Sequence, residues 1–216
     1  MDKYLNKIIC GDSLKILKEL PDNSVDLVLT DPPYGINYDN KDLNRQSPEN
    51  FGKIENDNGE IDYLNLITEF QRISKMVIVF GAINFMQDLP YKGIWICWDK
   101  RTKIEADKVF GSPFELAWCN KISGYDKIYR IMHGGVINAD RKELKKRVHP
   151  TQKPVELMKR IIEDFSKEDD IVLDPFLGSG TTAVACKQLK RNYIGIELSE
   201  EYCFIAKKRL EQDVLF

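Results

Sequence analysis

A glycine-rich turn near the end of the chain constrains its fold more than any other feature. Residues 171–183 read as a short apolar strand, a tight turn with Gly178 and Gly180, and the start of a helix. The two glycines let the backbone approach a ligand closely, and Ala183 stands where a dinucleotide-binding motif has its third glycine. Glu197, at the end of the next expected strand, is placed to accept hydrogen bonds from ribose hydroxyls. The motif predicts a nucleoside site, which an NAD enzyme would also satisfy.

The position of this turn shows how the rest of the sheet must be built. Only 36 residues follow Gly180 (216 − 180), enough for the motif's own helix and one more strand–helix pair. The other strands must therefore come from the N-terminal part of the chain, so the order of elements is circularly permuted. An NAD-binding domain is usually read forward from its glycine loop, and the position therefore counts against an NAD enzyme.

Short apolar runs alternate with helix-like stretches along the whole chain, which is typical of βαβ units. We expect an α/β fold in one domain, residues 1–216, with a mostly parallel seven-stranded sheet and helices on both faces. The expected strands are 7–10, 25–30, 76–80, 94–98, 114–119, 171–173 and 193–196, and the expected helices are 13–20, 61–74, 154–165, 181–189 and 200–211.

Two polar segments interrupt this alternation. Residues 37–62 contain almost no apolar side chains, and a loop of that length in a compact domain is usually functional or mobile. We expect it to close over the site. Residues 120–148 are basic, contain three glycines and show no strong period. We expect them to form a small insertion or subdomain on the sheet.

A second turn, Asp31–Tyr34, ends a buried strand abruptly with two prolines. Pro32 and Pro33 fix two φ angles and remove two backbone donors, so the carbonyl groups around them point outward as acceptors. Asp31 adds a carboxylate, and Tyr34 adds a flat aromatic face. This arrangement suits a planar aromatic amine that stacks on Tyr34. Acceptors on both amine hydrogens would draw its nitrogen toward a pyramidal, nucleophilic geometry.

The net charge of −2 conceals a basic segment. Residues 121–160 contain eleven Lys and Arg against four Asp and Glu, a local charge of +7 (11 − 4). Local patches, more than whole-chain charge, determine binding to phosphates, although a solvated helix face would have the same composition. The residues expected to contact phosphate groups are Arg141, Lys142, Lys145, Lys146 and Arg147.

The remaining composition argues against several classes of site. The five cysteines form no C-x-x-C pair, so neither a disulfide framework nor a cysteine-based zinc site is expected. His133 and His149 lie far apart, and no metal is expected. No apolar run approaches the ~18–20 residues that cross a bilayer. With no signal-peptide pattern either, we expect a cytoplasmic protein that binds no membrane.

Together the motifs resemble those of the S-adenosylmethionine-dependent amino-methyltransferases of DNA. The matching segments are 11–13 (Gly-Asp-Ser), 31–34 (Asp-Pro-Pro-Tyr), 149–154 (His-Pro-Thr-Gln-Lys-Pro), 174–182 (Asp-Pro-Phe-Leu-Gly-Ser-Gly-Thr-Thr) and 195–197 (Gly-Ile-Glu). The tetrapeptide precedes the glycine loop, which is the order of the family's β group, and the match covers nearly the whole chain. The resemblance implies a circularly permuted, Rossmann-like methyltransferase fold.

The resemblance also implies a role for each motif. Asp31, Pro32, Pro33 and Tyr34 would hold the target base at the site of transfer. The cofactor's ribose, adenine and methionine portions would be held by Asp12, Thr151, Lys153, Asp174, Phe176, Gly178, Ser179, Gly180, Thr181, Thr182 and Glu197. In that set, Thr151 and Lys153 would face the methionine end.

The implied reaction is methyl transfer to the exocyclic N6 of an adenine flipped out of double-stranded DNA. The basic residues would then contact the DNA phosphates, and the segment 120–148 would recognise the target sequence. Cytosine N4 is the nearest alternative, and those enzymes more often carry Ser in place of Asp31. Ring-carbon methylation of cytosine is excluded, because the enzymes that perform it use a Pro-Cys pair and this sequence contains none. A catalytically silent DNA-binding subunit and an RNA or protein methyltransferase are further alternatives. The sequence leaves open monomer or homodimer, and whether a companion restriction endonuclease exists.

Overall fold

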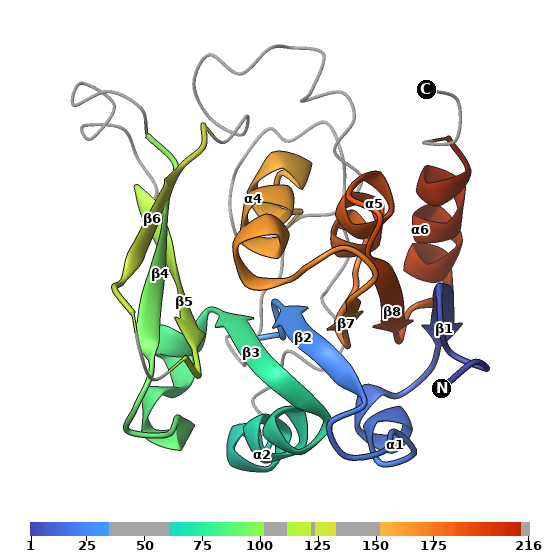
Figure 1. The fold of residues 1–216 in the computed structure, drawn as a ribbon, viewed down its shortest axis with the longest axis horizontal. Helices are drawn as coiled ribbons and strands as arrows, with labels where there is room; N and C mark the ends of the chain where they lie inside the picture. The colour runs from blue at the N-terminus through green and yellow to red at the C-terminus, as the bar shows by residue number, and fades with distance from the viewer. Residues whose placement is uncertain (35–60, 102–111, 122–123, 133–151, 213–216) are drawn as a thin grey trace, which may run out of the picture.

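The computed structural model describes residues 1–34, 61–101, 112–121, 124–132 and 152–212. They form an eight-stranded sheet with helices on both faces (Figure 1). The strands are β1 (Lys7–Cys10), β2 (Val25–Thr30), β3 (Ser74–Phe80), β4 (Ile94–Asp99), β5 (Phe114–Cys119), β6 (Lys127–Arg130), β7 (Ile171–Asp174) and β8 (Asn192–Glu197). The helices are α1 (Ser13–Leu17), α2 (Tyr63–Ile73), the 3-10 helix η2 (Ala82–Asp88), α4 (Val155–Phe165), α5 (Thr181–Gln188) and α6 (Glu200–Gln212).

The strand order β1-β8-β7-β2-β3-β5-β4-β6 confirms the permuted connection. Strand β7, which leads into the glycine turn, lies between β8 from the end of the chain and β2 from its beginning. In this spatial order, β1, β8, β7, β2 and β3 pair in parallel with one another, and β4 pairs in parallel with β6. Strand β5 is antiparallel to both of its neighbours, β3 and β4. The α/β class and the mostly parallel sheet are therefore confirmed.

The expected number of seven strands was wrong, because β6 adds an eighth. This strand lies within the segment 120–148 that was expected to be an insertion, and it pairs with β4 at the edge of the sheet. Tyr129 is its one buried side chain, and charged residues begin and end it. The sequence of β6 therefore shows no apolar pattern from which a strand is predicted. Residues 122–123 and 133–148 of that segment, and residues 37–60 of the expected loop, lie outside the described residues.

Alternating side chains divide the core between the two faces of the sheet. On β3, Val77 and Val79 pack with α1 and α2, while Ile78 and Phe80 pack with α4 and α5. All four are fully buried. Helices α4, α5 and α6 lie on one face, and α1 and α2 on the other (Figure 1). Within the described ranges, no helix has the length and apolar character needed to cross a bilayer.

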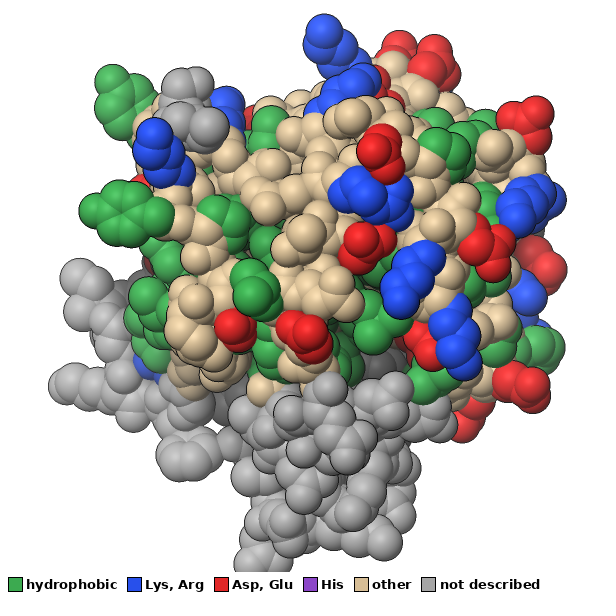
Figure 2. Space-filling view, turned by 90° about the horizontal axis from the view of Figure 1, so that it is seen from below, with side chains coloured by type: hydrophobic (Ala, Val, Ile, Leu, Met, Phe, Trp, Pro, Cys, Tyr) green, Lys and Arg blue, Asp and Glu red, His purple; other side chains and the backbone are tan. Residues whose placement is uncertain are grey.

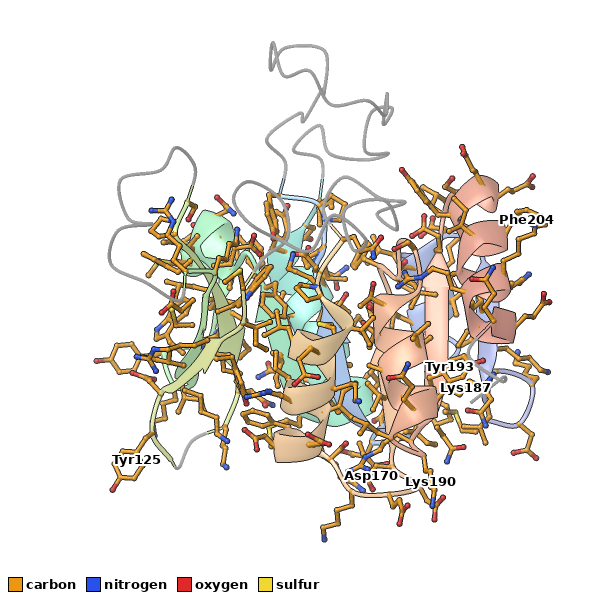
Figure 3. The ribbon with its side chains drawn as sticks, turned by 90° about the horizontal axis from the view of Figure 1, so that it is seen from above. Tyr125, Asp170, Lys187, Lys190, Tyr193 and Phe204 are labelled. Atoms are coloured by element: carbon orange, nitrogen blue, oxygen red, sulfur yellow. The ribbon has the colours of Figure 1, made fainter. Side chains whose placement is uncertain are left out.

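The described surface carries both charge signs. On the face in Figure 2, Lys and Arg side chains lie among Asp and Glu side chains. Exposed aromatic side chains are also separated. Tyr125 projects near the β4–β6 end of the molecule, whereas Phe204 lies on α6 at the other end (Figure 3). These two side chains therefore belong to no common patch.

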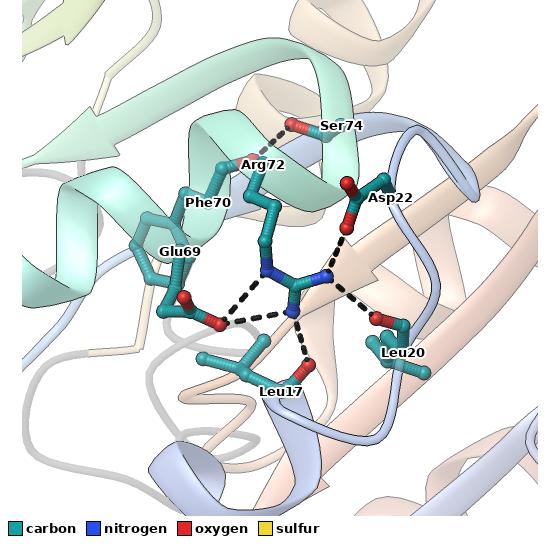
Figure 4. Close-up of polar contacts among 7 residues, drawn as sticks. All are labelled: Leu17, Leu20, Asp22, Glu69, Phe70, Arg72 and Ser74. Atoms are coloured by element: carbon teal, nitrogen blue, oxygen red, sulfur yellow. Dashed lines mark hydrogen bonds and ion pairs between the residues drawn. The ribbon is translucent and has the colours of Figure 1, made fainter.

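Arg72 fixes α2 against α1 beneath the centre of the sheet. Its guanidinium donates to the backbone carbonyls of Leu17 and Leu20, both at 2.9 Å, and so satisfies acceptors at the end of α1 (Figure 4). It also contacts Asp22 at 2.7 Å and Glu69 at 2.9 Å. This network lies beside β2 and β3, the strands that lead into the Asp31–Tyr34 turn and into Gly81.

Candidate active site

The candidate site lies where four parallel strands end together. Asp12 follows β1, Glu197 ends β8, Asp174 ends β7, and Asp31 follows β2. The register places Cys10 opposite Glu197 and Asp174 opposite Gly195, so these ends lie at one edge of the sheet. Ligands of open α/β sheets bind in the crevice outside the carboxyl ends of the strands. The structure therefore brings the tetrapeptide and the glycine loop to one place.

The Asp31 carboxylate is held from two sides. The hydroxyl of Tyr34 donates to Oδ1, and the ammonium of Lys153 contacts Oδ2. Burial raises the pKa of Asp31, and the positive charge of Lys153 opposes that shift. Lys153 was expected at the methionine end of a cofactor. Its ammonium pairs with Asp31 and lies 3.2 Å from Glu115 Oε2.

Tyr34 is held by residues that no motif contains. Its ring lies against Gly81, where an added Cβ would come within 1.9 Å of Tyr34 Cε1. Gly81 has φ +67°, a conformation that other residues rarely adopt. The adjacent Pro33 carbonyl, one of those expected to point outward as acceptors, accepts the Tyr63 hydroxyl at 2.6 Å. Tyr63 in turn stacks on Phe85, with ring centroids 4.2 Å apart.

Sequence reasoning missed these supporting residues. A glycine directly after a buried strand was the available signal for Gly81, because such a glycine often allows a close approach of the backbone. Tyr63 and Phe85 lie in helical segments and give no comparable signal.

The Asp174 carboxylate joins β2 to α5. Oδ1 accepts the Thr30 hydroxyl at 2.8 Å and the Phe176 backbone N–H at 3.2 Å, and Oδ2 accepts the Thr182 hydroxyl at 2.6 Å. Asp174 and Thr182 were expected to bind the cofactor, yet both turn toward protein partners. Burial raises the pKa of Asp174 to about 6. The group therefore holds the glycine loop against the strand that leads to Asp31.

Thr30→Val should lower the free energy of unfolding by about 1–3 kcal/mol, because it leaves a buried carboxylate short of a donor. The Thr30 hydrogen bond lowers the pKa of Asp174, so its loss raises that pKa further. Because the folded pKa lies above the unfolded one, ionised Asp174 reduces stability as pH rises through about 6. Urea unfolding should show a larger loss at pH 8 than at pH 5. Equal losses would contradict this role. Exposed Thr68, replaced by Val, is the control.

The glycine loop is held by Glu197 and by α6. Glu197 Oε2 accepts the Gly178 backbone N–H at 2.8 Å, and Oε1 accepts the Ser199 N–H at 2.9 Å. Gly180 has φ +87°, and a Cβ there would come within 2.7 Å of Ala206 Cβ. Glu197 thus lies beside the loop, as the sequence predicts for a ribose-binding carboxylate.

Arg209 of α6 is a second support that the sequence did not indicate. It donates to the Ser179 carbonyl at 2.6 Å, to the Ser179 hydroxyl at 2.9 Å and to the Thr181 hydroxyl at 3.3 Å. Asp12 accepts the Leu14 N–H at 2.9 Å as the N-cap of α1. Thr151 and the five basic residues 141, 142, 145, 146 and 147 lie outside the described residues.

Comparison with known proteins identifies the family. The family model described as DNA methylase, N6_N4_Mtase, matches residues 87–208, more than half of the chain. The chain belongs to the N6/N4 DNA methylase family. The Type II methyltransferase M.HpaI of Haemophilus parainfluenzae is 30% identical, over 96% of this methylase and 74% of its own length. M.HinfI of Haemophilus influenzae is 29% identical, over 98% of this methylase and 70% of its own length.

Solved structures show the same architecture. The M1.HpyAVI–SAM complex superposes with a TM-score of 0.59 and 26% sequence identity, covering 94% of the methylase and 98% of that chain. The PvuII cytosine-N4-specific DNA methyltransferase has a TM-score of 0.62 and 19% identity, covering 96% of the methylase and 89% of that chain, and shares the fold. The Rossmann-like fold is thereby confirmed. The methylase transfers methyl groups from S-adenosylmethionine to DNA.

Proposed function

We propose that the methylase acts on the exocyclic N6 of an adenine flipped out of double-stranded DNA. The observation that carries the proposal is the Asp31 carboxylate, which is held by Tyr34 and Lys153 and directly follows β2, the strand adjacent to β7. The resemblance of the sequence to the family favours adenine, because the cytosine-N4 enzymes more often have Ser in place of Asp31. Cytosine N4 is the second candidate, since the PvuII enzyme, named as cytosine-N4-specific, shares the fold.

The residues at the edge of the sheet fit S-adenosylmethionine. A carboxylate able to accept hydrogen bonds from two ribose hydroxyls, Glu197, lies against the backbone of the glycine loop. Asp12, Lys153, Phe176–Gly180 and Glu197 would line the cofactor site, with Asp174, Thr181 and Thr182 holding the loop from behind. When bound, the cofactor supplies an electrophilic methyl group and leaves as the neutral thioether.

The chain's own residues prepare the amine. Asp31 would accept a hydrogen bond from the target NH₂, and Tyr34 would stack on the base. The nitrogen lone pair forms the new N–C bond, and one amine proton must then leave. The Asp31 carboxylate is positioned to take that proton and release it to water. No metal enters this scheme, and the described residues contain no group of three or more His, Cys, Asp or Glu able to hold one.

DNA contact and assembly belong to the same proposal. We assign phosphate contact to Arg141, Lys142, Lys145, Lys146 and Arg147, and target recognition to residues 120–148, of which the described part contributes β6. The names of the relatives as Type II methyltransferases support a role beside a companion restriction endonuclease. A single catalytic domain, as monomer or homodimer, would suffice for this chemistry.

Nucleoside analysis tests the proposal. DNA lacking modified bases is incubated with the methylase and S-adenosylmethionine, digested to nucleosides and separated. We expect N6-methyladenine as the labelled product. N4-methylcytosine would replace the first candidate by the second, and DNA without label in the presence of bound cofactor would contradict both.

A further inference from the structure

Two carboxylates and two ammonium groups form a row of successive ion pairs that begins at Asp31. Asp31 pairs with Lys153, whose Nζ lies 3.2 Å from Glu115 Oε2, and Glu115 Oε1 lies 2.5 Å from Lys100 Nζ. The four groups come from the end of β2, the segment before α4, β5 and the end of β4. Their formal charges cancel. Lys153, in the middle, is 7% exposed.

One carboxylate oxygen in this row of ion pairs lacks a well-directed hydrogen bond. Glu115 Oε2 is buried, and its contact with Lys153 Nζ at 3.2 Å is an ion pair that lacks good hydrogen-bond geometry. A buried acceptor without a donor is unfavourable, and such groups are rare in native proteins. A small rotation of the Lys153 side chain would supply the missing hydrogen bond. Glu115 therefore offers Lys153 a second carboxylate.

Asp31, unlike Glu115, already has a donor on each carboxylate oxygen. Its two carboxylate oxygens accept from Tyr34 and Lys153. A target amine must share or replace one of these donors in order to be held. An ammonium is a strong competitor, because it brings a full positive charge to the carboxylate whereas the base amine is a neutral donor. If Lys153 kept its contact, the amine would bind Asp31 poorly.

We propose that Glu115 is a positioning residue that takes Lys153 from Asp31 when the base amine enters, and so leaves an Asp31 oxygen free for it. This inference rests on the proposed amine-accepting role of Asp31. Lys100, at 2.5 Å from Oε1, keeps the Glu115 carboxylate oriented with Oε2 toward Lys153. Because Lys153 stays between two carboxylates, it remains charged and the transfer needs no desolvation of a free ammonium.

The charges around Asp31 predict how this arrangement responds to pH. Asp31 faces Tyr34 within its own turn, Lys153 from the segment before α4 and Glu115 from β5, and it interacts electrostatically with Asp174 at the end of β7. The negative charge of Glu115 raises the pKa of Asp31, and that of Lys153 lowers it. Removing the Glu115 charge should therefore lower the pKa of Asp31, while Lys153 binds Asp31 more tightly.

Glu115→Gln tests the proposal by single-turnover methyl transfer at saturating DNA and cofactor. We expect the rate at pH 8 to fall about tenfold or more, with the affinity for S-adenosylmethionine unchanged. We also expect the acid limb of the pH–rate profile to move to lower pH. A slower enzyme with an unmoved acid limb would assign Glu115 a merely structural role and overturn the proposal, as would an unchanged rate.

Two further variants sharpen the test. Glu115→Asp keeps the charge but is too short to reach Lys153, so the rate should fall while the acid limb, which follows the charge, stays in place. If Glu115→Gln does not fold, an unchanged rate in Glu115→Asp, or an acid limb that moves, overturns the proposal. Glu69→Gln removes a comparable partner from Arg72 on α2 (Figure 4) and should change stability alone. A wild-type enzyme that methylates no DNA would instead refute the proposed function.

Discussion

Asp31→Ala is expected to reduce methyl transfer by about a thousandfold or more, because it removes the acceptor that holds and activates the amine. Affinity for S-adenosylmethionine should be retained, since Glu197 and the glycine loop are untouched. Lys153 keeps Glu115 as a partner, so the fold should survive with reduced stability. Single-turnover transfer of labelled methyl groups to DNA measures the rate, and titration calorimetry measures the cofactor affinity.

Asp26→Ala is the matched control for this variant. Asp26 lies on the same strand as the turn, pairs with Lys75 at 2.6 Å and accepts the Ile171 backbone N–H at 2.9 Å. Its loss removes an ion-paired carboxylate from β2 without touching the turn. We expect lower stability and an unchanged transfer rate. An Asp31→Ala enzyme that retained a tenth of the wild-type rate would exclude Asp31 as the amine acceptor.

Gly81→Ala is expected to be nearly as damaging, although Gly81 belongs to no sequence motif. The new Cβ would come within 1.9–2.5 Å of three Tyr34 ring atoms, and φ +67° adds backbone strain. The Tyr34 ring must therefore move, and with it the hydroxyl that donates to Asp31. We expect a transfer rate about a hundredfold lower, because a misplacement of about 1 Å at a reacting centre has that effect. Cofactor affinity should not change.

Gly93→Ala separates this displacement from general overpacking. A Cβ at Gly93 would come within 2.3 Å of Trp118 Nε1 and 2.6 Å of the Cys119 carbonyl oxygen, which is also a collision with an aromatic ring but away from the site. Both variants should unfold at lower urea concentration, but only Gly81→Ala should lose transfer rate at a temperature where both are folded. Equal rates in the two variants would contradict the role of Gly81.

The sequence predicted most of the fold because buried strands are continuous apolar runs. Val25–Thr30 and Ile171–Asp174 have few polar side chains and are flanked by turns, which marks a parallel strand covered on both faces. Strand β6 has one buried side chain, so its place is set by pairing with β4 rather than by its own pattern. The 3-10 helix η2 was also not predicted, since a kink at Phe85 interrupts the helical period.

The candidate site was predictable where its chemistry is local in sequence. Asp31–Tyr34 and the glycine loop are contiguous motifs whose backbone geometry follows from proline and glycine. The contacts of Lys153 with Asp31 and Glu115 join residues from three segments far apart in the chain, and no spacing rule predicts such a meeting. Asp174 stands inside a motif but turns toward Thr30 and Thr182, which depends on side-chain packing.

The central claim is that the glycine loop holds the cofactor while Asp31 holds the amine in the same site. Single-turnover transfer and cofactor binding, measured side by side on Asp31→Ala and Glu197→Ala, test it most directly. Asp31→Ala should bind the cofactor normally and transfer almost nothing. Glu197→Ala should bind the cofactor about tenfold more weakly or worse and transfer at a near-normal rate once saturated. If Asp31→Ala lost cofactor binding while Glu197→Ala kept it, the assignment of the two halves of the site would be contradicted.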